Sequence, residues 1–254
     1  MRHYHSPVPP PDLVARFRAA RTDPTLAVLE GFHAIKHGIR FGAQFESIVT
    51  RDAAELRSFI DRLAPDVGAA LTGLATGATR DTFDALSPTP PETGVIAIAR
   101  RPGTTMADVV ALQRNAPIVL LESPSHSGNI GAVIRVTAGA GAAAVITTGP
   151  NDPWNPGAIR GSAGLHFALP VVRSETFEIP GRQLIAIHPD GDELGDTAVP
   201  DDAVLAFGSE RSGLSAELLG RATRRIRIPM EPRVSSLNLA TSVAVVMYSW
   251  RLAR

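Results

Sequence analysis

The sequence predicts an α/β protein with two domains, a small one in the first half and a larger one in the second. Three observations indicate this fold class. Short apolar runs typical of buried strands alternate with segments whose apolar residues recur at helical spacing. The 254 residues suffice for one large domain or two modest ones. A break of arginine, proline and glycine at residues 100–103 divides the alternation into two runs.

Composition excludes several classes of protein. The chain has no cysteine, which rules out a disulfide scaffold, a thiol enzyme and a cysteine-ligated metal site. No apolar run approaches the ~20 residues that cross a membrane, and the start, MRHYHSPVPPPD, lacks the apolar stretch of a signal peptide. We therefore expect a soluble, cytoplasmic protein with no membrane partner.

The first run predicts a small α/β domain over residues 25–100. Residues 1–24 begin proline-rich and are expected to be a flexible segment, although residues 12–21 have the spacing of a short amphipathic helix. Apolar residues from Leu56 to Leu63 also recur at helical spacing. The elements expected here are, in order, strand 26–29, helix 32–40, strand 45–50, helix 53–63, helix 81–86 and strand 94–99.

The second run predicts the larger domain over residues 116–254, joined by a linker over residues 101–115 that contains a helix at 104–113. Because helices separate its strands, we expect a parallel sheet covered on both faces. The elements expected are strand 118–121, helix 130–138, strand 143–148, strand 183–188, strand 203–207, helix 214–222, strand 225–228 and a terminal helix 236–251.

The terminal helix is unusual because residues 234–250 contain no charged side chain. It is too short and too polar to cross a membrane, yet a helix that is apolar nearly all round must be buried on every side. Either a subunit interface or the interior of one chain can provide that burial. We predict a homodimer with this helix in the interface.

Arginine replaces lysine almost completely, since Lys36 is the only lysine among 25 basic residues. Two explanations are open for this preference for arginine. One is nucleotide bias in the coding genome, and the other is the planar guanidinium group, which binds phosphate and RNA. The net charge is zero, so a nucleic-acid site would be a local patch. Five arginines of the second half either form such an RNA-binding patch or are ordinary solvated surface. They are Arg221, Arg224, Arg225, Arg227 and Arg233.

Three patterns resemble known sites but lack an essential feature. The glycines of residues 139–144 follow a helix and precede a strand, the reverse of a dinucleotide-binding turn. His33 and His37 have zinc spacing, but Ala34 stands where a metalloprotease has glutamate. Residues 190–193 lack the spaced oxygen ligands of a calcium loop. We expect no bound metal.

Three segments of the second half place polar residues or glycine where a buried sheet needs apolar ones. The first is SGNIGAVIR at residues 127–135, at the end of a strand, where open α/β sheets bind ligands. Here Asn129 is expected to cap the helix. Arg135 lies in an apolar helix and needs a partner, which is either a structural ion pair or a site.

The second segment is FGSERSGLS at residues 207–215, and the third runs from Ile228 to Asn238. Gly208 ends a strand and allows a ligand to approach the backbone, or else belongs to an ordinary tight connection. Ser236 and Asn238 are either helix caps or part of a polar site shared between subunits.

Together and in this order, the three segments resemble motifs 1, 2 and 3 of the TrmH family, also called SpoU, of SPOUT-superfamily RNA ribose 2′-O-methyltransferases. The intervening NPGAIRGSAG at 155–164 and LPV at 169–171 also match, so the resemblance covers residues 116–254. Residues 25–100, with LEG at 29–31 and TGVIA at 93–97, resemble the family's small substrate-binding domain. Motif 3 departs from the family at Pro232, where glycine is common, and at LAT in residues 239–241.

The resemblance implies a catalytic SPOUT domain with a parallel sheet and a trefoil knot, a rare exception to unknotted chains. It also implies a homodimer formed through the last helix. The methyl donor would be S-adenosylmethionine, held in a pocket of knotted loops without any metal. The matching cofactor-binding residues are Gly208, Ser209, Ile228, Met230 and Leu237, with His188 as a further candidate.

The resemblance further implies that Arg135 activates the ribose 2′-hydroxyl. Because arginine stays protonated, we expect its guanidinium to hold phosphate and stabilise developing alkoxide charge. The N-terminal domain is of the type found on ribosomal-RNA enzymes, so rRNA is the expected substrate and tRNA the alternative. An RNA-binding assembly factor that has lost catalysis is a second alternative, but the proposed catalytic residues are intact: Asn129, Arg135, Glu210, Ser236 and Asn238.

Overall fold

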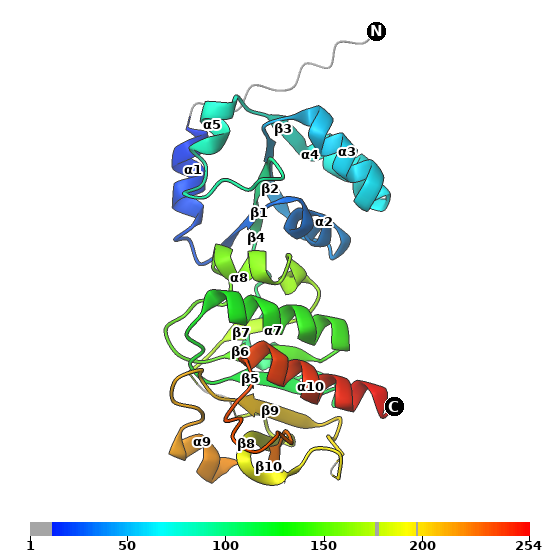
Figure 1. The fold of residues 1–254 in the computed structure, drawn as a ribbon. Helices are drawn as coiled ribbons and strands as arrows, with labels where there is room; N and C mark the ends of the chain where they lie inside the picture. Colours follow the sequence, from blue (N-terminus) through cyan, green and yellow to red (C-terminus); the bar gives the residue numbers. More distant parts are fainter. Residues whose placement is uncertain (1–11, 176–177, 197) are drawn as a thin grey trace. The chain divides into compact units, whose positions relative to one another are not determined.

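The computed structural model describes residues 12–175, 178–196 and 198–254, which form two compact units (Figure 1). Unit 1 consists of Met1–Gly103 and Trp154–Phe167, and unit 2 consists of Thr104–Pro153 and Ala168–Arg254. The break expected at residues 100–103 therefore lies at a unit boundary. The segment 154–167, which the sequence assigned to the larger domain, clusters instead with unit 1. Most of the expected flexible segment, residues 1–11, lies outside the described residues.

Unit 1 is built on a mixed four-stranded sheet in the order β1-β4-β2-β3. Strands β1 and β2 both run antiparallel to β4, whereas β3 runs parallel to β2. Figure 1 shows α1 and α5 on one side of this sheet and α2, α3 and α4 on the other. The strands are β1 Leu26–Glu30, β2 Phe45–Thr50, β3 Ala75–Gly77 and β4 Val95–Arg100; the helices are α1 Leu13–Ala20, α2 Phe32–Arg40, α3 Ala53–Leu63, α4 Gly68–Leu74, α5 Arg80–Asp84 and α8 Pro156–Gly161, with short 3₁₀ turns at Pro65–Val67 and Leu165–Phe167.

Helix α1 confirms the amphipathic helix expected over residues 12–21. Its Leu13, Phe17 and Ala20 are buried in one cluster with side chains of β1, β2, β4 and α5. The expectation of a flexible segment over residues 1–24 is therefore wrong for this helix, because its apolar face is part of the core.

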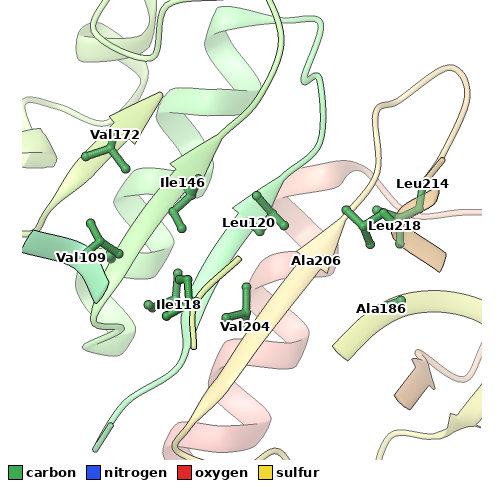
Figure 2. Close-up of a cluster of buried hydrophobic side chains, with 12 residues drawn as sticks. Val109, Ile118, Leu120, Ile146, Val172, Ala186, Val204, Ala206, Leu214 and Leu218 are labelled. Atoms are coloured by element: carbon green, nitrogen blue, oxygen red, sulfur yellow. The ribbon is translucent and has the colours of Figure 1, made fainter. Parts of the chain in front are cut away.

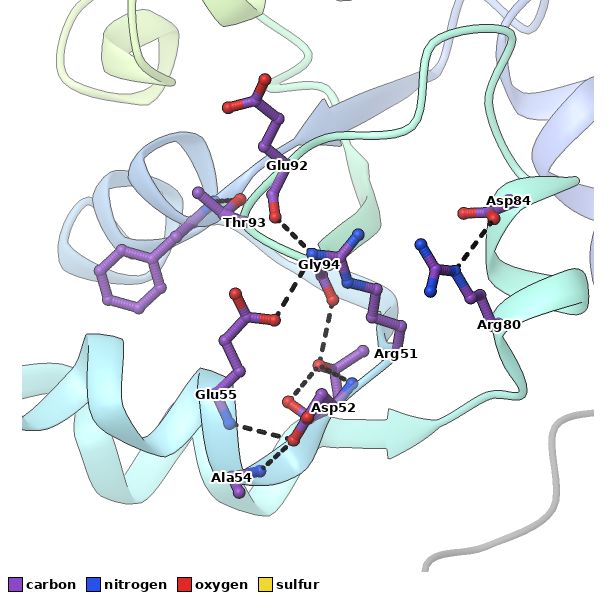
Figure 3. A network of polar contacts seen from close by, with 11 residues as sticks. Arg51, Asp52, Ala54, Glu55, Arg80, Asp84, Glu92, Thr93 and Gly94 are labelled. Atoms are coloured by element: carbon purple, nitrogen blue, oxygen red, sulfur yellow. Dashed lines mark hydrogen bonds and ion pairs between the residues drawn. The ribbon is translucent and has the colours of Figure 1, made fainter.

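Polar side chains hold the starts of two helices of unit 1, α3 and α2 (Figure 3). Asp52 caps α3, because its carboxylate accepts hydrogen bonds from the backbone of Ala54 at 2.8 Å and of Glu55 at 3.0 Å. The Thr93 hydroxyl accepts from the backbone of Phe32 at 3.0 Å, at the first residue of α2. Arg51 donates to the Glu92 carbonyl oxygen at 2.7 Å and so holds the loop before β4.

The buried carboxylate of Glu30 attaches α8 to β1. It accepts hydrogen bonds from Ser87 at 2.7 Å, from Arg21 at 2.6 Å and from Arg160 of α8. Burial alone would raise the pKa of Glu30, but these three donors outweigh it and hold the pKa below its usual value. The contact explains why a segment far along the chain clusters with the first strand.

Unit 2 is built on a six-stranded sheet in the order β10-β8-β9-β5-β6-β7, and every pairing in it is parallel, as expected. Figure 2 shows alternate residues of β5, β6 and β9, such as Ile118 and Leu120, packed on one face with Val109 and Leu218. The strands are β5 Ile118–Leu121, β6 Ala144–Thr147, β7 Val171–Arg173, β8 Gln183–Glu193, β9 Ala203–Phe207 and β10 Arg224–Arg227; the helices are α6 Met106–Val110, α7 Ser127–Ala140, α9 Ala216–Arg221 and α10 Leu239–Leu252.

Two helix starts in unit 2 differ from the sequence prediction. Helix α7 begins at Ser127 after His126, so Asn129 lies in its first turn and is not its cap. Helix α10 begins at Leu239, because Asn238 caps it by accepting from the backbone of Ala240 at 2.9 Å. Helix α7 ends at Ala140, and the next residue, Gly141, has φ +79°. Strand β6 follows, so these glycines form a helix end and a turn, as expected, and not a dinucleotide-binding turn.

Helix α10 is buried on only one side within a single chain. It packs against α7, and Val243, Val246 and Met247 are among its buried residues. The side chains of Val245, Tyr248 and Leu252 are exposed by 38, 42 and 82%. Complete burial of the helix within one chain, one of the two alternatives, is therefore wrong. In the part of the chain that the structure describes, no helix has the length and apolar character needed to cross a membrane.

Candidate active site

The candidate site lies where β5 and β9 end. These neighbouring parallel strands place Leu121 opposite Phe207, and the next residue, Glu122, still donates its backbone N–H to the Phe207 carbonyl oxygen at 2.9 Å. The chain after β5 leads into α7, and the chain after β9 leads into α9. Since parallel strands end at the same edge of a sheet, segments 122–129 and 208–215 meet there.

The loop at residues 208–215 is compact because its two ends are hydrogen-bonded to each other. Ser209 and Gly213 exchange backbone hydrogen bonds of 3.1 and 3.0 Å. A Cβ on Gly208 would lie 2.1 Å from the backbone carbon of Gly213. Glycine is therefore required at position 208 because the chain packs on itself, as in the alternative of a tight connection; that Gly208 also contacts a ligand stays a prediction.

Glu210 links this loop to the segment that follows β5. Its Oε2 accepts from the Ser125 backbone at 3.0 Å and from the Ser125 hydroxyl at 2.7 Å, and its Oε1 accepts from Asn129 Nδ2 at 2.7 Å. Burial would raise the pKa of Glu210, but these donors outweigh it and lower the pKa to about 2. A carboxylate with this pKa is a poor general base near neutral pH, so Glu210 is suited to orienting its neighbours.

The same network reaches the start of α10 through two asparagines. Asn129 donates to Glu210, and its own Oδ1 accepts from Asn238 Nδ2 at 3.2 Å. Asn238 in turn is fixed because its Oδ1 caps α10. Side chains from the three segments that the sequence singled out are therefore joined in one hydrogen-bonded network. Each of the two amide groups keeps one N–H that no protein atom in this network accepts.

Two adjoining cavities open beside this network. The large cavity, of about 480 Å³, lies next to Asn129, Gly208 and Glu210. The small cavity, of about 150 Å³, lies next to His188, Ile228 and Met230. The two share part of their walls, so together they have the size of a site for a cofactor or small substrate. The shared wall consists of Ile187, Ser236, Leu237 and Ser242.

The structure brings together all the predicted site residues except Arg135. Asn129, Gly208, Ser209, Glu210 and Asn238 line the large cavity; His188, Ile228 and Met230 line the small one; Ser236 and Leu237 line both. Their roles in binding and catalysis stay predictions.

Arg135 lies on the exposed side of α7 and lines neither cavity. It follows Asn129 by six residues, which places it ~9 Å further along the helix axis and on another face. With respect to the residues that the structure describes, its side chain makes no hydrogen bond and no ion pair. The structural ion pair considered for this arginine is therefore wrong.

Several residues of the site were not predicted. Ser125 and His126 lie in a run of small and polar residues directly after β5. A polar run at the end of a buried strand indicates a site, so these two residues could have been predicted from the sequence. Ile187 gave no such signal. It lies where β8 leaves its pairing with β10, since Arg225 pairs with Ala186 but the next residue pairs with Asp192. An irregularity of this kind arises between strands and leaves no local pattern.

Most of the expected basic patch is neutralised. Arg221 is paired with Glu178 and Glu217, Arg224 with Asp192, and Arg227 with Glu193. For these three arginines the alternative of ordinary solvated surface fits better than an RNA-binding patch. Arg225 donates to the Leu219 carbonyl oxygen, and Arg233 lies in the loop before α10 with φ +76°.

His33 and His37, the pair with zinc spacing, belong to no cluster of metal-binding side chains within the described residues. The Nδ1 atom of His37 is hydrogen-bonded to the Ala163 carbonyl oxygen at 2.7 Å, within unit 1. Over residues 12–175, 178–196 and 198–254, the structure contains no group of three or more histidine, aspartate or glutamate side chains that could hold a metal ion.

Comparison with known proteins gives three kinds of similarity. Residues 116–248 match the SpoU rRNA Methylase family. The chain is 28% identical over 232 residues to a 23S rRNA (adenosine(1067)-2′-O)-methyltransferase of Streptomyces laurentii. The aligned region covers 87% of this chain and 84% of that protein. A crystal structure described as an RNA 2′-O ribose methyltransferase superposes with a TM-score of 0.76 at 28% identity and 95% coverage of both chains. The SpoU methyltransferase AviRb of Streptomyces viridochromogenes, in complex with AdoMet, superposes with a TM-score of 0.75 at 22% identity, covering 95% of this chain and 98% of that one.

Proposed function

The chain belongs to the SpoU rRNA methylase family, as its three motifs predicted, and from that premise we propose that it methylates a ribose 2′-hydroxyl of ribosomal RNA with S-adenosylmethionine as donor. The observation that carries the proposal is the network of Ser125, Asn129, Glu210 and Asn238, because it joins all three motifs at the wall of one cavity.

The cavities suit S-adenosylmethionine, which combines an apolar purine with polar and charged ends. Ile187, Ile228 and Leu237 provide apolar walls, and Ser209 and Ser236 provide hydroxyl groups. We assign donor binding to these cavities, with Gly208, Ser209, His188, Ile228, Met230 and Leu237 as the residues that hold it. When bound, the donor supplies a methyl group on a positively charged sulfur, ready for attack by the ribose oxygen.

The protein's own residues would orient the acceptor and stabilise charge. Asn129 and Asn238 line the large cavity, and each has an amide N–H outside the network that can donate to the ribose or to a phosphate. Glu210 is ionised and holds Asn129, and it is not the proton acceptor, because its pKa is about 2. Arg135 lies on the open side of α7, where its planar guanidinium can hold an RNA phosphate and stabilise the developing oxyanion.

We further propose that the protein is a homodimer formed through α10. The exposed Val245, Tyr248 and Leu252 recur at helical spacing and form an apolar stripe that a second copy would cover. Because α7 packs beside α10, Arg135 would then lie near the edge of that interface. We also propose the trefoil knot of the family for the chain after β9, which returns through residues 228–238 to the cavity walls. Residues 25–100 are proposed to bind the RNA substrate.

One experiment tests the enzymatic proposal directly. The purified protein is incubated with S-adenosylmethionine labelled in its methyl group and with either ribosomal RNA or total tRNA. We expect label in the ribosomal RNA, at ribose 2′-oxygens. Label in tRNA alone would move the substrate to the alternative class. Binding of RNA without binding of the donor in calorimetry would favour an assembly factor without catalysis.

A further inference from the structure

A second carboxylate holds the loop at residues 208–215, at its C-terminal end. Glu122, the residue after β5, accepts from the backbone N–H of Ser215 at 2.7 Å and from its hydroxyl at 2.6 Å. Glu122 lines neither cavity, and Ser215 lines neither. Neither residue belongs to the network around Glu210, and the sequence predicted no role for either.

Ser215 is the point at which the loop ends and α9 begins. It caps α9, since its hydroxyl oxygen accepts from the Leu218 backbone at 3.1 Å. The hydroxyl proton is then left to Glu122, so one side chain satisfies the cap and the carboxylate together. At the other end, the Phe207 carbonyl oxygen is bonded to the Glu122 backbone at 2.9 Å. Glu122 thus binds the residue immediately before the loop, Phe207, and the last residue of the loop, Ser215.

The two carboxylates act in opposite directions across the same pair of segments. Glu122 reaches from the chain after β5 to the far end of the loop, whereas Glu210 reaches from the loop back to Ser125 and Asn129. The backbone pairing of Ser209 with Gly213 makes the loop compact, so a shift of its end moves the whole loop. Gly208, Ser209 and Glu210 on this loop form part of the large cavity wall.

We propose that Glu122 is a positioning residue for the methyl-transfer site: through Ser215 it holds the loop that presents Gly208, Ser209 and Glu210 to the large cavity. This inference rests on the proposed function for its ligand, S-adenosylmethionine, but the contact itself is a property of the chain alone. Charge-assisted hydrogen bonds are among the stronger ones in proteins, so their loss loosens the loop more than loss of a neutral bond would.

The first test measures the loop without any ligand. Amide hydrogen exchange is compared between the wild-type protein and the Glu122→Ala variant. We expect at least tenfold faster exchange for the amides of Ser209, Gly213 and Ser215, and unchanged exchange in the strands of unit 1. Unchanged exchange in the loop would overturn the proposal, whether or not the protein is a methyltransferase.

The second test measures donor affinity by calorimetry. We expect the Kd for S-adenosylmethionine to rise about tenfold in Glu122→Ala, to rise to a similar extent in Ser215→Ala, and to remain near the wild-type value in Ser215→Thr, which keeps the hydroxyl. Both alanine variants lose the hydrogen bond between the Ser215 hydroxyl and Glu122, so their effects on the Kd should be less than additive in the double variant. Additive losses, or a wild-type Kd in both single variants, would contradict the inference.

Glu217→Ala is the matched control, since this exposed glutamate also lies in the first turn of α9 but pairs with Arg221. It should leave the Kd unchanged, and a tenfold rise would contradict the inference, because removal of a carboxylate that does not bond Ser215 would then have the same effect as Glu122→Ala. Should Glu122→Ala fail to fold, Ser215→Ala against Ser215→Thr decides the question in both assays. Absence of donor binding by the wild-type protein would refute the proposed function. The exchange experiment would still test whether the contact between Glu122 and Ser215 holds the loop.

Discussion

Replacing Glu210 with glutamine should destabilise the protein in a pH-dependent way. The carboxylate accepts three hydrogen bonds at 2.7 to 3.0 Å, two from Ser125 and one from Asn129. A glutamine side chain has one acceptor oxygen and one NH₂ group, so it places an N–H donor against one of these donors. The three contacts cannot all survive in either orientation of the amide.

The size of the effect follows from the pKa of Glu210, which is about 2 against an ordinary value of 4.5. A difference of this size corresponds to roughly 3 kcal/mol of preference for the ionised form in the folded state. The residue is largely exposed and solvent screens its interactions, so we expect about 1 kcal/mol of folding free energy from this source.

The direction in which stability changes with pH follows from the lowered pKa of Glu210. Because the pKa is lowered on folding, the stabilisation is fully present above pH ~4.5 and is lost as the pH falls toward 2. Urea unfolding at pH 7 and at steps below pH 4.5 measures the difference in free energy of unfolding between the wild-type protein and Glu210→Gln. We expect a gap of about 1 kcal/mol at pH 7 that shrinks below pH 4.5. A gap that does not change with pH, or no gap at pH 7, would refute this account of Glu210.

Three further predictions test other parts of the account. Gly208→Ala should lower the free energy of unfolding, measured in urea, by about 2 kcal/mol, because its Cβ would meet the Gly213 backbone at 2.1 Å. The control Gly220→Ala should not destabilise the protein, because a Cβ there meets nothing within 4 Å. Arg135→Ala should reduce kcat about 100-fold with an unchanged Kd for the donor, and Arg135→Lys should not restore it; full turnover of the lysine variant would remove the argument from the planar fork. Tyr248→Glu should convert a dimer into a monomer in light scattering, and a dimeric variant would place the interface elsewhere.

Much of the fold could be predicted because its elements follow local patterns. The helix expected at residues 32–40 and the strand expected at 45–50 have these bounds in the structure. The elements that the sequence did not reveal are short, such as β3, α8 and β7. Such segments carry too few residues for a hydrophobic period, and contacts distant in sequence stabilise them, as Glu30 does for α8.

The site was predictable as a set of residues but not as an arrangement. The polar segments after the strands pointed to Asn129, Glu210 and Asn238, and the structure places all three at one cavity. Their connections span 81 and 109 residues, so no spacing in the sequence reveals which side chain bonds to which. For the same reason Glu122 and Ser215, 93 residues apart, were not recognised as a pair.

The basic residues were the least predictable feature. The sequence shows a run of arginines near β10 but does not show that Asp192 and Glu193 pair with two of them across the sheet. Conversely, Arg135 lies in an apolar helix, where an ion pair was a reasonable alternative, yet its side chain is exposed. Charge pairing depends on which strands become neighbours, and that is decided by the tertiary fold.

The central claim is that this chain transfers methyl groups to the ribose of ribosomal RNA, and one measurement tests it most directly. Ribose methylations are mapped in total RNA from cells with the gene, without it, and with the gene carrying Arg135→Ala. We predict that one 2′-O-methylated nucleotide in ribosomal RNA is lost without the gene and is not restored by the variant. A methylation map that is identical with and without the gene would contradict the claim.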